Sequence, residues 1–229
     1  VDIFWSYNFP VIAVILYVFA DGLELRKILI CSMVLIAGLR LGTHLLFRVA
    51  SHLDEEEGRY KQLRKDWAPH ADKRFFWFFQ MQGISNVILA LPFFIIAINK
   101  DAELHLLEYV AVGIWLLSVF GEGLADYQLS RFKKNPANKG KVCEVGLWRY
   151  SRHPNYFFQW CLWVSYFVFA LASPYGFLGI ISPLIILHLL TNVTGIPPTE
   201  EQAVRSKGEA YTRYQQTTSA LVPWFRKMP

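Results

Sequence analysis

Charged residues are scarce in this 229-residue sequence. They make up 18% of the chain, whereas 54% of the residues are hydrophobic and 16% are aromatic. An ordinary soluble domain carries about 25% charged residues and fewer apolar ones. The scarcity therefore excludes an ordinary soluble domain, and the long apolar runs predict a polytopic helical membrane protein.

Cysteine is also rare, and two common kinds of site are missing. Cys31, Cys143 and Cys161 are scattered, so they form neither a disulfide framework nor a metal-ligand pattern, and no metal is expected. The sequence has no glycine-rich strand–turn–helix fingerprint, which excludes a Rossmann dinucleotide site. No cleavable signal peptide is visible. A bound nucleotide would have to be held between helices.

Six segments are long and apolar enough, or nearly so, to cross a membrane, for which roughly 20 residues are needed. They are residues 3–20, 28–49, 75–98, 104–129, 156–171 and 175–193. We expect one all-α membrane-embedded domain over residues 1–229, folded as a bundle of these spans.

Basic residues account for the formal net charge of +5, and they gather in three long connecting or terminal segments. These segments are residues 51–74, 131–154 and 195–229, the last of which includes a predicted polar helix over 199–214. The positive-inside rule places them in the cytosol. The same rule explains the charge without nucleic acid, which we exclude as a partner. Both a bacterial inner membrane and an endoplasmic reticulum fit this pattern.

Polar residues recur at helical spacing in five of the predicted spans. The groups are Arg40, His44 and Arg48; Gln82 and Asn86; Glu122, Asp126, Leu129 and Lys133; Asn155 and Gln159; and His188 and Asn192. Ionisable groups are costly in hydrocarbon and usually face the bundle interior or a wet cavity. We therefore expect the five polar stripes to converge on one cavity that opens to the cytosol.

Some of these groups also have a purely structural interpretation. Hydrogen bonds between helices would account for the pairs in the third and sixth spans. Arg48 and Lys133 lie near helix ends and can extend to the headgroups. Glu122 and Asp126 favour function, because two acids one turn apart repel each other unless a partner or a proton intervenes.

A basic and aromatic block, Gly146-Leu-Trp-Arg-Tyr-Ser-Arg-His-Pro-Asn-Tyr156, directly precedes the apolar run 157–171. Its donors are Arg149, Arg152, His153 and Asn155. Helix N-termini favour anions, and arginine binds phosphate in a two-point geometry. Asp126 would accept hydrogen bonds from ribose hydroxyls or an adenine amine, and Tyr150 or Tyr156 would stack on a ring. The block predicts a phosphate-bearing ligand, with an anionic lipid headgroup as the alternative to a dinucleotide.

This block resembles the steroid 5-alpha-reductase superfamily and, within it, the bacterial-type branch long catalogued as a domain of unknown function. Further matching segments are Val1–Trp5, Leu39–Leu41, Glu57–Tyr60, Thr199–Glu201, Tyr211–Tyr214 and Thr217–Phe225, so that the resemblance covers nearly the whole chain. The Arg-His-Pro-Asn-Tyr motif also occurs in sterol Δ14-reductases and, in looser form, in membrane methyltransferases that use S-adenosylmethionine.

The resemblance implies a seven-helix reductase that binds NADPH from the cytosolic side and reduces an activated C=C bond of a steroid or other lipid. One helix is then expected before Val1, and we expect a monomer. Cofactor contacts matched by motif are Asp126, Leu129, Lys133, Arg152, His153, Asn155, Tyr156, Gln159, Glu201, Tyr211 and Tyr214. The polar stripes and the basic block add Arg40, Arg48 and Tyr150 as expected cofactor contacts.

The chain departs from the family pattern at the catalytic positions. Gln159 stands where relatives carry an acid near the nicotinamide, and Lys133 where they often carry arginine. The residues that polarise the substrate ketone in the steroid enzymes have no clean counterparts. We take His44, Tyr7 and Asn8 as candidates for that group, with Gln159 as the fourth catalytic candidate.

Two other functions remain open on the sequence. Glu200–Glu201 and the His-Pro motif also fit methyl transfer from S-adenosylmethionine. The missing acids fit a non-catalytic membrane protein that binds a lipid or sterol. The cluster of arginines favours a phosphate-rich dinucleotide over a sulfonium ligand.

Overall fold

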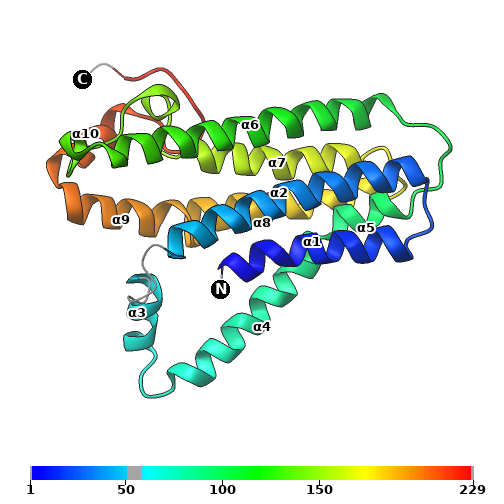
Figure 1. The fold of residues 1–229 in the computed structure, drawn as a ribbon, viewed down its shortest axis with the longest axis horizontal. Helices are drawn as coiled ribbons and strands as arrows, with labels where there is room; N and C mark the ends of the chain where they lie inside the picture. The colour runs from blue at the N-terminus through cyan, green and yellow to red at the C-terminus, as the bar shows by residue number, and fades with distance from the viewer. Residues whose placement is uncertain (1, 51–57, 228–229) are drawn as a thin grey trace. The chain divides into compact units, whose positions relative to one another are not determined.

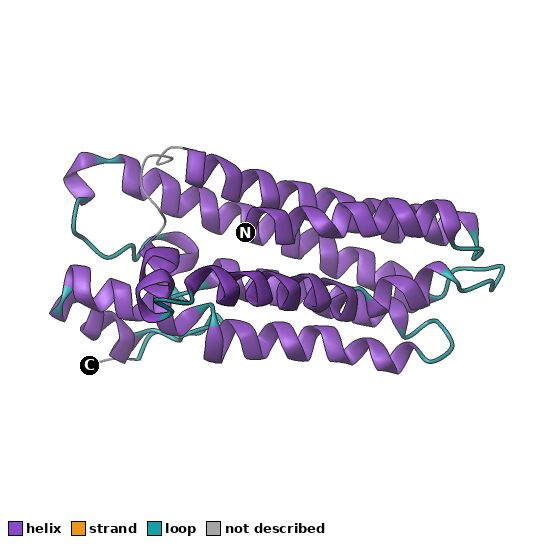
Figure 2. Cartoon of the chain, turned by 90° about the horizontal axis from the view of Figure 1, so that it is seen from below, coloured by secondary structure: helices purple, strands orange, loops and turns teal. Residues whose placement is uncertain are grey.

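The computed structural model describes residues 2–50 and 58–227, and within them the regular structure is helical (Figure 2). Outside the helices, the described residues form one isolated parallel bridge, between Ser151 and Ser219. The expected all-α class is confirmed. The chain forms two compact units, Val1–Leu104 with Ser173–Leu178, and His105–Ala172 with Gly179–Pro229.

The first unit is built on a pair of long helices. Its helices are α1 (Asp2–Phe19), α2 (Glu24–Ala50), α3 (Gly58–Asp66), α4 (Ala71–Leu89) and α5 (Leu91–Ala97). The helices α1 and α2 pack along each other (Figure 1). Pro92 stands in the first turn of α5, where a missing N–H costs nothing, so the predicted span 75–98 is divided at Ala90 into two helices.

A buried arginine closes the loop that follows α5. Arg26 is fully buried, and its guanidinium donates to the backbone carbonyls of Asn99 (3.2 Å), Asp101 (2.9 Å) and Glu103 (2.8 Å). These contacts supply a charged donor to three carbonyls of the loop that follows the end of α5. Arg26 therefore serves to fold the loop.

The second unit is built on the antiparallel pair α6 (Leu106–Lys134) and α7 (Pro154–Ala170), which lie side by side (Figure 1). The remaining helical segments are η1 (Pro136–Asn138), η2 (Gly146–Arg149), α8 (Ile181–His188), the π-helical turn η4 (Leu189–Val193), α9 (Ile196–Lys207) and α10 (Glu209–Thr217). A short 3-10 helix, η3 (Gly176–Ile180), precedes α8. The predicted polar helix over 199–214 is instead two helices, because Gly208 adopts a positive φ of 55° between them.

In the part of the chain that the structure describes, four helical segments are long and apolar enough to cross a membrane. They are Glu24–Phe47, Ala71–Ala97, Leu106–Lys134 and Gly176–Lys207. The helix over Ile3–Phe19 is apolar but shorter, and α7 has 17 residues. Bulky apolar side chains also cover the outside of α6, where Leu117 and Phe120 are 70% and 72% exposed. The chain is thus a multi-pass membrane protein with four long apolar helices, and the six spans expected from the sequence stay a prediction.

Candidate functional site

Hydrogen-bonding side chains connect α6 to α7 in the second unit. Trp115 Nε1 donates to the Tyr166 hydroxyl at 3.3 Å, and Asn155 Nδ2 donates to Asp126 Oδ1 at 3.2 Å. Between these pairs, Gln159 faces Glu122, and with the amide nitrogen directed at the carboxylate it lies 3.0 Å from both oxygens. We call the last two pairs the polar rungs.

The polar rungs follow from the helical repeat. Glu122 and Asp126 are four residues apart on α6, and Asn155 and Gln159 are four residues apart on the antiparallel α7. Residues at this spacing lie on one face of a helix, so the two faces meet pair by pair. Glu122 is 4% exposed, whereas Asp126 and Asn155 are half-buried. Acceptors on α6 therefore face donors on α7 along one seam, from the buried interior towards the start of α7.

Close packing between the two helices depends on a glycine. A Cβ at Gly121 would lie 2.5 Å from the ring of Phe158, closer than real contacts allow. The ring occupies the space that a side chain would need. Gly121 thus lets α7 approach α6 near the polar rungs.

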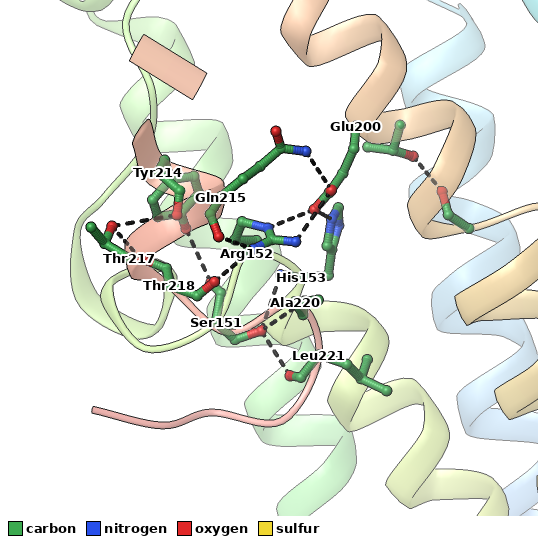
Figure 3. A network of polar contacts seen from close by, with 12 residues as sticks. Ser151, Arg152, His153, Glu200, Tyr214, Gln215, Thr217, Thr218, Ala220 and Leu221 are labelled. Carbon is green, nitrogen blue, oxygen red and sulfur yellow. Dashed lines mark hydrogen bonds and ion pairs between the residues drawn. The ribbon is translucent and has the colours of Figure 1, made fainter. Parts of the chain in front are cut away.

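The start of α7 is fixed by an ion pair with α9. Arg152 Nε lies 2.6 Å from Glu200 Oε1, and Arg152 Nη2 lies 3.2 Å from Glu200 Oε2 (Figure 3). Arg152 Nη1 also donates to the carbonyls of Gln215 (2.8 Å) and Thr218 (2.6 Å). The side chains of Arg152 and Glu200 are only 11% and 12% exposed. We call these residues, with His153 and Ser151, the Arg152 network.

Further contacts complete the shell around Glu200. His153 Nε2 lies 3.0 Å from Glu200 Oε1, and Gln215 Nε2 donates to Oε2 at 2.7 Å. Ser151 Oγ donates to the Leu221 carbonyl at 2.7 Å and accepts from the backbone N–H of His153 at 3.1 Å. Every carboxylate oxygen of Glu200 has at least two partners, which a buried charge requires.

Tyr214 holds the segment before α7 in place. Its hydroxyl donates to the carbonyls of Ser151 (3.1 Å) and Trp148. Burial raises the pKa of Tyr214, and it also raises that of Tyr211, whose ring packs against Tyr214 with centroids 5.8 Å apart. Both phenols stay neutral at physiological pH and act as donors.

The structure gives Arg152 a different immediate role from the one that the sequence suggests. Four of its five N–H groups bind Glu200 and two backbone carbonyls within the protein. This geometry connects α7, α9 and α10, and it makes Arg152 a positioning residue. Direct contact between Arg152 and a phosphate stays a prediction.

Glu200, at the centre of this network, was not among the predicted cofactor contacts, because sequence reasoning took the neighbouring Glu201 instead. Glu201 is exposed and pairs with Arg205 at 2.5 Å. The signal was present in the sequence: Glu200 is four residues after the apolar Ile196, so a helix places both on its buried side.

Two lysines come together near the end of α6. Burial raises the pKa of the Cys143 thiol, and the positive charges of Lys207 and Lys133 oppose that rise. Lys133 is exposed and Lys207 is half-buried, with its ammonium 5.8 Å from the ring centre of Tyr211. The two cations, from α6 and α9, therefore both lie in the surroundings of Cys143.

The other expected cofactor contacts of the second unit lie around the start of α7. The rings of His153 and Tyr156 stack at 5.2 Å, and the Tyr156 hydroxyl lies 3.3 Å from Thr199 Oγ1. Leu129 is half-buried on α6, on the helix face of Asp126. Tyr150 is 41% exposed, and its ring meets Phe225.

The remaining candidates belong to the first unit. The Tyr7 hydroxyl lies 3.1 Å from Thr43 Oγ1, and Asn8 Nδ2 donates to Asn86 Oδ1 at 3.4 Å. Arg40 is half-buried and His44 is exposed. The Arg48 side chain, Val1 and Glu57 lie outside the described residues. Convergence of all five polar stripes on one cavity stays a prediction.

Helices and site together define a multi-pass membrane protein with a polar, partly buried site on a helix pair. A family model described as "Protein of unknown function (DUF1295)" matches residues 1–218, and the chain belongs to this family. The comparisons with curated proteins and with solved structures gave no match.

Proposed function

We propose that this protein is a membrane reductase of the steroid 5-alpha-reductase type, which uses NADPH to reduce an activated C=C bond of a steroid or other lipid. The observation that carries the proposal is the pair of polar rungs beside the start of α7. Charged and amide groups along an apolar helix pair are costly, and they are typical of functional sites in membrane proteins.

The donors and acceptors of the second unit suit the parts of a dinucleotide. Asp126 and Asn155 are suited to ribose hydroxyls and to a carboxamide, because together they offer acceptors and donors. Lys133 and Lys207 supply positive charge for phosphates. The Arg152 network holds the first turn of α7 in position for this binding.

When bound, NADPH supplies the hydride. The chain contributes orientation and exclusion of water, which are the main duties of a protein toward such a cofactor. The resemblance leads us to expect an acidic residue at position 159, where this chain has the amide Gln159. Glu122 places a carboxylate directly opposite this amide. We propose that Glu122 provides the missing negative charge from α6. Tyr7, Asn8 and His44 remain sequence candidates for the group that polarises the substrate carbonyl.

Direct binding measurements test the proposal. The purified protein is titrated with NADPH and, separately, with S-adenosylmethionine, and its thermal stability is followed. A ligand at 100 times its dissociation constant adds about 2.7 kcal/mol of stability. We expect NADPH to stabilise the protein and S-adenosylmethionine to have no effect. The reverse result would establish the methyltransferase alternative.

Variants of the site residues test where NADPH binds. Asp126→Asn and Asn155→Ala should each weaken NADPH binding at least tenfold, whereas Gln216→Ala, exposed on α10, should not change it. Unchanged affinity in both site variants would sink the proposal. Tight NADPH binding without oxidation over a panel of enone steroids and unsaturated lipids would instead favour a non-catalytic lipid-binding protein.

A further inference from the structure

A cavity of about 510 Å³ lies in the first unit, at the start of α4. Its lining residues are Trp67, His70, Lys73, Arg74, Trp77 and Phe78. Lys73, Arg74, Trp77 and Phe78 recur at steps of three and four on α4, so they share one side of this helix, whereas Trp67 and His70 come from the turn before it. We call this cavity the α4 pocket.

Aromatic packing shapes the α4 pocket. Trp67 lies edge-on to Phe75 with centroids 4.9 Å apart, and it meets Phe78 at 5.8 Å. These contacts hold the segment between α3 and α4 against the first turns of α4, beside α3 (Figure 1). Trp77 stays 59% exposed, which leaves an apolar wall that no described residue covers.

The charge of the α4 pocket is positive. Lys73 and Arg74 are exposed, and among the described residues neither side chain has an ion-pair partner. The neighbouring Asp72 is directed to Arg64, 3.6 Å away. His70 adds ring nitrogens that can donate or accept. A ligand that complements this cavity has an anionic group and an apolar body.

The position along the helix also points to a membrane surface. The apolar segment Ala71–Ala97 has 27 residues, which at 1.5 Å per residue span roughly 40 Å. The hydrocarbon core is only about 30 Å thick. At the far end Ile96 and Ala97 are buried, so the exposed bases and Trp77 mark the end that reaches the headgroups.

We propose that the α4 pocket binds the headgroup of an anionic phospholipid, with Lys73 and Arg74 holding the phosphate and Trp77 lying against the glycerol and upper acyl chains. Basic clusters beside a membrane helix recognise anionic lipids in this way. This binding does not depend on the reductase activity proposed above.

Native mass spectrometry of the full chain tests the proposal, with phosphatidylglycerol and phosphatidylcholine as the probes. The Lys73→Gln/Arg74→Gln variant should bind phosphatidylglycerol roughly 30-fold more weakly, the factor for two basic residues near a charged surface. Lys139→Gln/Lys141→Gln removes two exposed charges elsewhere and should keep the affinity within twofold. Trp77→Ala should weaken both lipids.

Several outcomes would overturn the proposal. The first is an unchanged affinity of the Lys73→Gln/Arg74→Gln variant, and the second is an equal loss of affinity in the Lys139→Gln/Lys141→Gln control. The third is competition by millimolar inorganic phosphate that is as effective as competition by the lipid, which would indicate a small-anion site. Thermal unfolding without added lipid confirms that the variants fold. If the double variant unfolds, the single variants Lys73→Gln and Arg74→Gln should each lose about fivefold, and no loss in either would refute the site.

Discussion

Arg152 and Glu200 form a two-point ion pair, with Nε–Oε1 and Nη2–Oε2 distances of 2.6 and 3.2 Å, between the start of α7 and the helix α9. The pair is almost fully buried and is completed by His153, Gln215 and a backbone carbonyl from Thr218. Buried pairs of this kind contribute more to a defined geometry than to net stability. Here the pair fixes the position of the start of α7, which forms part of the proposed cofactor site.

Removal of one member of this pair should destabilise the fold strongly. Arg152→Ala leaves Glu200 buried without its main partner, and such losses cost about 3–5 kcal/mol. Arg152→Lys should also fail to restore stability, because an ammonium lacks the planar fork. Chemical unfolding in detergent measures the effect. The exposed neighbouring pair Glu201–Arg205 provides the control, since Glu201→Gln should change stability little.

This experiment also separates the two roles of Arg152. A positioning residue lowers the stability and the NADPH affinity together. A phosphate ligand would lower the affinity alone, and a stable Arg152→Ala variant that has lost NADPH binding would contradict the positioning role.

Exchanging the carboxylate and the amide of the Glu122–Gln159 pair should reveal the contact between these two side chains. Gln159→Glu places a second carboxylate about 3 Å from Glu122, and we expect a loss of about 1–3 kcal/mol. The double variant Glu122→Gln/Gln159→Glu restores an amide–carboxylate pair and should recover most of that loss. Equal stability of the single and double exchange variants would show that the two side chains do not interact.

The same pair of variants tests the proposed role of Glu122. If reduction requires a carboxylate at this place, whichever of the two helices carries it, the double variant should regain part of the NADPH-dependent activity that Glu122→Gln loses. Assays with an enone panel measure this.

Gly121 should tolerate no larger residue unless Phe158 is shortened. Gly121→Ala introduces a Cβ 2.5 Å from the Phe158 ring, and overpacking of this kind costs about 1–3 kcal/mol. Phe158→Leu in the Gly121→Ala background should recover stability, as measured by thermal unfolding. Gly113→Ala on the same helix is the control, because a Cβ there has no neighbour within 4 Å.

Arg26 should be essential for folding of the first unit. Arg26→Leu leaves the carbonyls of Asn99, Asp101 and Glu103 without this donor, at a cost of about 1–3 kcal/mol for each one that stays unsatisfied. Poor expression or a much lower unfolding midpoint is expected. Lys100→Gln, in the same loop but exposed, should be tolerated. A stable Arg26→Leu protein would mean that water satisfies these carbonyls.

The helix faces that form the polar rungs could be predicted from the sequence. The i,i+4 spacing of Glu122 with Asp126 and of Asn155 with Gln159 defines one face on each helix. The pairing of residues across the two faces could not be predicted. The register between two helices depends on packing, including the Gly121–Phe158 contact.

The role of Arg152 shows a different limit. The motif around it precedes the start of α7, and its arginine suggested an anion. The nearest anion in the structure is Glu200, 48 residues further along the chain. Periodicity says which face a residue occupies but does not say which distant side chain meets it.

The all-α class and the membrane setting follow from the sequence alone, because apolar length and the helical repeat are local properties of the chain. The family follows from the sequence as well, through motifs spread over residues 1–218. Only the tertiary structure decided which charges neutralise each other, that Arg26 folds a loop and that Glu122 faces Gln159. These pairings depend on burial and on contacts between segments far apart in the chain, where removal from water makes an unpaired charge too costly to keep.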